Sequence, residues 1–76
     1  MKAVIETVLG ILNLPADTMI DDSFGVETCE RWDSMAQISI VVALGNLFNT
    51  SFEMDEAMNM DTIGGIKKVL TEKGLI

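Results

Sequence analysis

Histidine is absent from this chain and bases are few, which removes most of the usual means of catalysis. Without histidine there is no Ser-His-Asp or Cys-His set and no zinc site built from Cys and His. Neither a glycine-rich phosphate loop nor a Walker lysine is present. The acids at 17, 21 and 22 do not form an EF-hand, because counting back from Gly25 places Ile20 at the first ligand position. We therefore expect a protein that is not an enzyme and has no metal site.

Cysteine and long apolar runs are also scarce. Cys29 is the only cysteine, so no intramolecular disulfide can form, which fits a reducing, cytoplasmic setting. The apolar run 35–44 is too short to cross a bilayer, and the N-terminus lacks the pattern of a secretory signal. The sequence thus predicts a cytoplasmic protein without membrane insertion.

Acidic residues are what the chain has in excess. Twelve acids stand against five bases, for a net charge of −7. Between Asp17 and Asp61 there are ten acids and one base, Arg31. Such a surface repels nucleic acid and attracts basic partner surfaces, mainly by speeding encounter. The alternative is a solvated surface that only keeps a small domain in solution.

The apolar periodicity predicts a single all-α domain over residues 1–76. The predicted helices cover residues 2–12, 34–48, 55–60 and 62–73, and the second begins at Asp33 or Ser34. The third is short, and the loop 13–33 is unusually long for so small a domain. We expect that loop to be anchored on the bundle by its apolar residues, Leu14, Met19, Ile20, Phe24 and Val26.

The helices should bury one face each. The fourth helix places Ile63, Ile66, Val69 and Leu70 inward, and Gly64-Gly65 in its first turn indicates close backbone contact with a neighbour. In the second helix the expected inward stripe is formed by Met35, Ile38, Val41, Val42 and Phe48, and it is widened by Ile40, Leu44 and Leu47.

Ser34 is where the remaining chemistry lies, because it opens an uncharged apolar helix and follows Asp33. As a plain N-cap, it would satisfy one N–H group of the first helical turn. The same position can hold an anionic group, where free N–H donors and the positive end of the helix dipole point. Its hydroxyl could also accept a group from a transferase, with Asp33 helping to hold a metal ion. On these residues alone, the structural role of Ser34 as a cap and its two chemical roles all stay open.

One arrangement of features extends over essentially the full chain. A first helix is followed by an acidic loop with Phe24 and then by Trp32-Asp33-Ser34-Met35 at the start of the second helix, which ends in Leu47-Phe48. After it come Phe52, the short segment 55–60 and Thr62-Ile63-Gly64-Gly65-Ile66. In this combination the chain resembles an acyl carrier protein. The resemblance implies a monomeric four-helix bundle with a long first loop and a short third helix. It also implies that Ser34 receives 4′-phosphopantetheine from coenzyme A through a magnesium-dependent phosphopantetheinyl transferase, with Asp33 near the metal.

The resemblance further implies a function. The arm would carry acyl or related groups as thioesters between loading and processing enzymes with basic surfaces. The alternatives are an aminoacyl or peptidyl carrier of a specialised pathway, or an unmodified acidic interaction module. The pathway stays open among fatty acid, polyketide, peptide and surface-polysaccharide synthesis.

Two departures from the family's pattern bear on the partners. The glutamates usual along the second helix are missing, since no charge occurs from Met35 to Phe52. Methionine replaces the usual leucine after the serine. We therefore expect partner contacts at Met35 and Trp32, and either at the loop acids Glu27 and Glu30 or on the short third helix.

Overall fold

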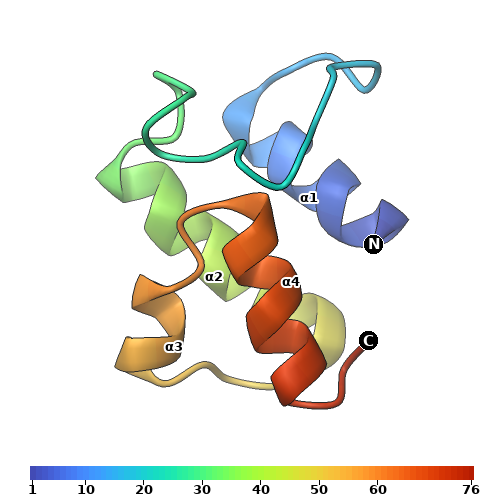
Figure 1. The fold of residues 1–76 in the computed structure, drawn as a ribbon, viewed down its shortest axis with the longest axis vertical. Coiled ribbons are helices and arrows are strands. Elements are labelled where there is room, and N and C mark those ends of the chain that lie inside the picture. The colour runs from blue at the N-terminus through green and yellow to red at the C-terminus, as the bar shows by residue number, and fades with distance from the viewer.

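The computed structural model describes residues 1–76 and contains four α-helices and no β-strand (Figure 1). They are α1 (Lys2–Leu12), α2 (Ser34–Phe48), α3 (Met54–Met58) and α4 (Ile63–Glu72). The predicted all-α fold with four helices is confirmed. α1 and α2 both end on asparagines in the left-handed conformation, Asn13 at φ 57° and Asn49 at φ 52°. The longest helix, α2, has 15 residues. A membrane-spanning helix needs about 20 predominantly apolar residues, and none of the four helices meets that requirement.

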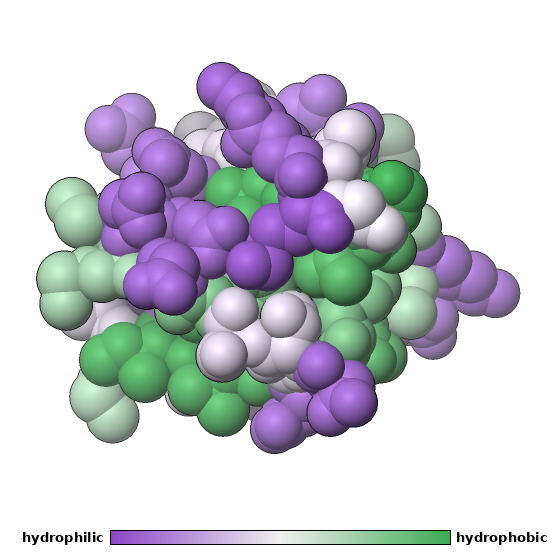
Figure 2. Space-filling model, turned by 90° about the horizontal axis from the view of Figure 1, so that it is seen from below, coloured by the Kyte–Doolittle hydropathy of each residue, from purple (hydrophilic) through white to green (hydrophobic).

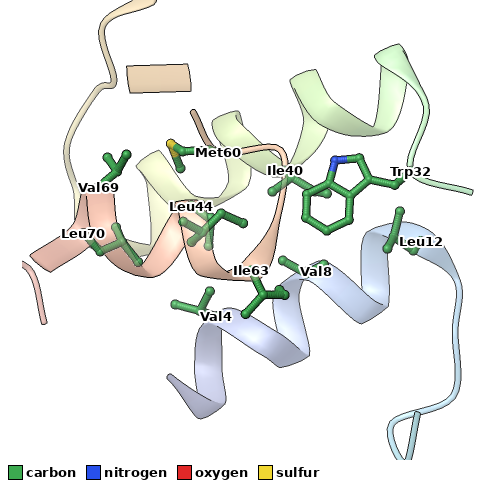
Figure 3. Close-up of a cluster of buried hydrophobic side chains, with 11 residues drawn as sticks. Val4, Val8, Leu12, Trp32, Ile40, Leu44, Met60, Ile63, Val69 and Leu70 are labelled. Carbon is green, nitrogen blue, oxygen red and sulfur yellow. The ribbon is translucent and has the colours of Figure 1, made fainter. Parts of the chain in front are cut away.

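The core lies where α1, α2 and α4 meet (Figure 3). α4 contributes the four residues predicted for its inward face, all nearly inaccessible to solvent. The other members come from α1, α2, the loop before α2 and the turn before α4. The cluster comprises Val4, Val8, Leu12, Trp32, Ile40, Leu44, Met60, Ile63, Ile66, Val69 and Leu70.

The inward face predicted for α2 is correct only in part. It is confirmed at Ile40, Leu44, Val41 and Phe48, which are buried or pack against the core, and it is wrong at Met35, Ile38, Val42 and Leu47. Ile40 and Leu44 are fully buried, whereas Met35, Ile38 and Val42 are 74%, 62% and 58% exposed. α2 has no charged side chain and is apolar on several sides, so its periodicity does not indicate which side faces the core. Packing of Ile40 and Leu44 against the other helices selects that side, and the rest of the apolar surface is left in contact with solvent.

The connection between α1 and α2, residues 13–33, has no helix and is fastened to the start of α4. The backbone N–H of Val26 donates to the carbonyl of Asp61 at 3.0 Å. In return, the N–H groups of Ile63 and Gly64 donate to the carbonyls of Phe24 and Asp22, at 2.9 and 2.8 Å. These bonds satisfy N–H groups that the first turn of a helix cannot pair internally.

Three of the five residues expected to anchor this loop do so, because Leu14, Ile20 and Phe24 pack against the core. Met19 and Val26 do not, being 91% and 43% exposed. Backbone hydrogen bonds to α4, rather than the side chains of Met19 and Val26, hold this part of the loop in place. Close approach at the glycines is confirmed, since a Cβ on Gly64 would lie 3.0 Å from the carbonyl oxygen of Asp22.

α3 begins and ends earlier than predicted, because Glu56 fixes its start. The Glu56 carboxylate accepts from the backbone N–H of Glu53 at 2.8 Å. The same carboxylate receives the ammonium group of Lys73 at 3.2 Å. The pKa of the Glu56 carboxyl is held below its ordinary value, mainly by the hydrogen bond from the Glu53 N–H and to a smaller extent by the Lys73 ammonium group. Beyond α3 the chain turns Met60 into the core.

Candidate functional site at the start of helix α2

Ser34 is the first residue of α2, and the residue before it supplies the cap. Asp33 has extended backbone angles, and its Oδ1 accepts from the backbone N–H of Ala36 at 2.9 Å. The interpretation of Ser34 as a plain N-cap is therefore wrong. Its side chain is exposed, and its hydroxyl makes no hydrogen bond within the chain. The fold leaves this hydroxyl free to react.

The backbone around Ser34 favours an anion. As the first two residues of the helix, Ser34 and Met35 have N–H groups with no carbonyl partner inside α2. The positive end of the helix dipole lies at the same place. The carboxylates of Asp33 and Asp61, which both line the adjacent groove, repel an anion. A divalent cation between them and a phosphate would offset this repulsion.

A groove of about 440 Å³ opens beside Ser34, between α2 and α3. It is open to solvent, and half of its lining residues are apolar. Segments distant in the sequence form it, and its lining comprises Val26, Asp33, Ser34, Gln37, Ile38, Ala57, Met58 and Asp61. A flexible group attached to Ser34 would start at one edge of this groove.

Gln37, one turn after Ser34, connects three parts of the molecule. Its Oε1 accepts from the indole N–H of Trp32 at 2.6 Å. Its Nε2 donates to the carbonyls of Ala57 and Met60, both at 3.0 Å. Sequence reasoning did not identify this residue. A signal was present, because Gln37 is the only glutamine in an otherwise nearly apolar helix.

Trp32 cannot contact a partner as expected, because only 1% of it is exposed. It lies in the core among the side chains of Figure 3. Its ring centroid is 6.1 Å from that of Phe24. The bond to Gln37 satisfies the one polar group of the indole, which allows complete burial.

The other predicted partner residues are accessible but dispersed. Met35 is strongly exposed, and Glu27 and Glu30 are exposed on the loop. None of the three lines the groove, whereas Asp33 and Ser34 both do. At the groove, Ile38 of α2 and Met58 of α3 are both lining residues, and they are 62% and 71% exposed. Figure 2 shows apolar side chains interrupting the hydrophilic surface on one face of the molecule.

Comparison with known proteins gives one informative result. No protein-family model matches the chain, and no curated protein matches it. Among solved structures, a protein from Mycobacterium tuberculosis described as an acyl carrier protein (Rv0033) superposes with a TM-score of 0.80. The match covers 95% of each chain at 19% sequence identity. The chain therefore has the fold of an acyl carrier protein.

Proposed function

We propose that this chain is a carrier protein that holds acyl or related intermediates as thioesters on a 4′-phosphopantetheine arm attached to Ser34. One observation supports this most directly. In an acyl-carrier fold, Asp33 caps α2 and so leaves the Ser34 hydroxyl exposed and unbonded beside a groove. The fold itself makes no use of this hydroxyl.

The residues present fit attachment of the arm. The Ser34 oxygen would form a bond to the phosphorus next to the pantetheine of coenzyme A, and the pyrophosphate bond would break to release adenosine 3′,5′-bisphosphate. With no histidine in the chain, the transferase supplies the base that takes the hydroxyl proton. Asp33 uses Oδ1 for the cap, which leaves Oδ2 for a magnesium ion. When attached, the arm supplies a thiol that carries the cargo.

Partner recognition would combine contact and charge. The apolar surface of α2 next to Ser34, with Met35 and Ile38, would contact the transferase and the loading and processing enzymes. The excess of acid, including Glu27 and Glu30 on the loop, would speed encounter with basic enzyme surfaces. A tethered cargo then reaches a high effective concentration at each enzyme that it visits.

Intact-mass spectrometry tests the proposal. The protein is incubated with coenzyme A, magnesium and a broad-specificity phosphopantetheinyl transferase. We expect the mass of one phosphopantetheine to be added to the unaltered protein and nothing to be added to Ser34→Ala. Ser39→Ala is the matched control, since Ser39 is also exposed on α2, and it should be modified normally.

An unmodified wild-type protein would favour the other candidate, an acidic interaction module that keeps the fold without the arm. Modification of Ser34→Ala would also contradict the assignment of the site. If the arm is added, the mass of the loaded protein from its native host distinguishes an acyl carrier from an aminoacyl or peptidyl carrier.

A further inference from the structure

We propose that Gln37 holds α3 closed against α2 and thereby excludes long aliphatic cargo from the interior, so that this carrier holds short acyl groups at its surface. The inference rests on the proposed function, because the cargo is tethered at Ser34. The part of the groove that matters is its floor, which is formed by Gln37.

Both polar atoms of the Gln37 amide are hydrogen-bonded. Its two N–H donors are used by two carbonyls and its oxygen by one indole N–H. The reversed orientation would place N–H groups against an N–H donor and an oxygen against two carbonyls, so this orientation is fixed. These bonds join α2 to the end of α3, the turn after it and the loop before Ser34.

The space behind Gln37 is already filled. Trp32 is 1% exposed, and Ile40, Leu44 and Met60 are completely buried. The molecule has three cavities, and none of them is lined by any of these four residues. The groove at Ser34 therefore leads to a polar floor and a packed core.

An aliphatic chain that entered from the groove would have to part α3 from α2. Doing so would break both bonds from Gln37 Nε2 and leave that amide group and the carbonyl of Met60 without partners. The carbonyl of Ala57 would keep the backbone N–H of Met60. Groups left unpaired in this way are costly, and the packed core has no space for the methylene groups of a long chain unless buried side chains such as Met60 are displaced as well. Short cargo stays in the open groove, where Ile38 and Met58 provide limited apolar contact.

The test compares the protein loaded with acetyl- or octanoyl-phosphopantetheine from the corresponding coenzyme A thioesters. Intact mass first verifies loading, and then Tm and the rate of thioester cleavage by hydroxylamine are measured. In the wild type we expect the octanoyl form to melt within about 2 °C of the acetyl form and to be cleaved at a similar rate. A larger rise in Tm, or strong protection of the octanoyl thioester, would overturn the inference.

Two variants assign the effect to Gln37. In Gln37→Leu the bonds are gone and the floor is apolar, so octanoyl should raise Tm over acetyl by about 5 °C or more. A merely structural role would lower Tm equally with both cargoes. Ser39→Leu, an equivalent change on the exposed side of α2, should behave like the wild type. The inference is wrong if Gln37→Leu shows no larger rise than the wild type, or if Ser39→Leu shows the same rise.

Failure of the proposed function gives a different result, because no arm would be added at all. In that case methyl or octyl groups are attached as disulfides to Ser34→Cys in a Cys29→Ala background, and the same Tm comparison is made. If Gln37→Leu does not fold, as judged by circular dichroism, Gln37→Met replaces it. The wild-type comparison does not depend on either variant.

Discussion

Asp33 and Ser34 are neighbours that could each have capped α2, and the structure gives the task to Asp33 alone. That division explains why a short polar residue at the start of a helix can be chemically available. Asp33 thus holds the helix, and in the proposed function it has a second role in holding a cation. These roles depend on different properties of the side chain, because capping needs an acceptor oxygen and cation binding needs the charge.

Asp33→Asn and Asp33→Ala separate the two roles. Asparagine caps about as well as aspartate, so Asp33→Asn should leave the free energy of unfolding nearly unchanged, while Asp33→Ala should lose about 1 kcal/mol. Both should slow phosphopantetheine transfer at limiting magnesium, since both remove the charge. Urea unfolding and a mass time course measure the two effects. Normal transfer to Asp33→Asn at limiting magnesium would exclude the role at the cation.

Among the helices, the sequence predicted position better than orientation. The bounds of α1 and α2 could be predicted because Asn13 and Asp33 mark where they end and begin. The orientation of α4 could be predicted because Lys67 and Lys68 define its outer side. α2 has no such mark, so its inner face had to be found from packing. Trp32 and Gln37 could not be paired from the sequence, because their bond depends on how the loop returns to the helix.

The exposed face of α2 yields a prediction for partner binding. Met35→Ala should change stability little, because Met35 is 74% exposed, yet it should weaken transferase binding about tenfold. Glu27→Lys and Glu30→Lys should instead slow association, with an effect that fades at high salt. Asn46→Lys, which adds charge to α2 away from Ser34, is the control and should have less effect than any of the three. Surface plasmon resonance gives both rates, and unchanged binding by Met35→Ala would exclude α2 as the contact.

Across the whole molecule, the long loop and α4 stabilise each other. The loop supplies carbonyls to the start of α4, and Asp22 also pairs with Lys67 at 3.1 Å. The ion pair is exposed and contributes little. The backbone contact is tighter, because Gly25 lies directly against Asp61 and Thr62.

Two glycine substitutions test this contact. A Cβ at Gly25 would collide with the carbonyl of Asp61 and lie 2.7 Å from Cγ2 of Thr62, so Gly25→Ala should cost about 2 kcal/mol. Gly10 lies in α1 with nothing within 4 Å of the same position, so Gly10→Ala should gain up to about 1 kcal/mol. Urea unfolding measures both. Equal effects would mean that the loop is not held at Gly25.

The pairing of Gly25 with Thr62 also sets an order of events during synthesis. A ribosome releases the loop and Ser34 well before it releases the start of α4. Until that last helix emerges, the carbonyls of Asp22 and Phe24 lack the N–H groups that hold them in the finished protein. Before that, the loop is held only at its end next to Ser34, where Arg31 donates to the carbonyl of Asn13 at 2.7 Å. The proposed modification of Ser34 on a fully anchored loop therefore has to wait until the start of α4 has emerged.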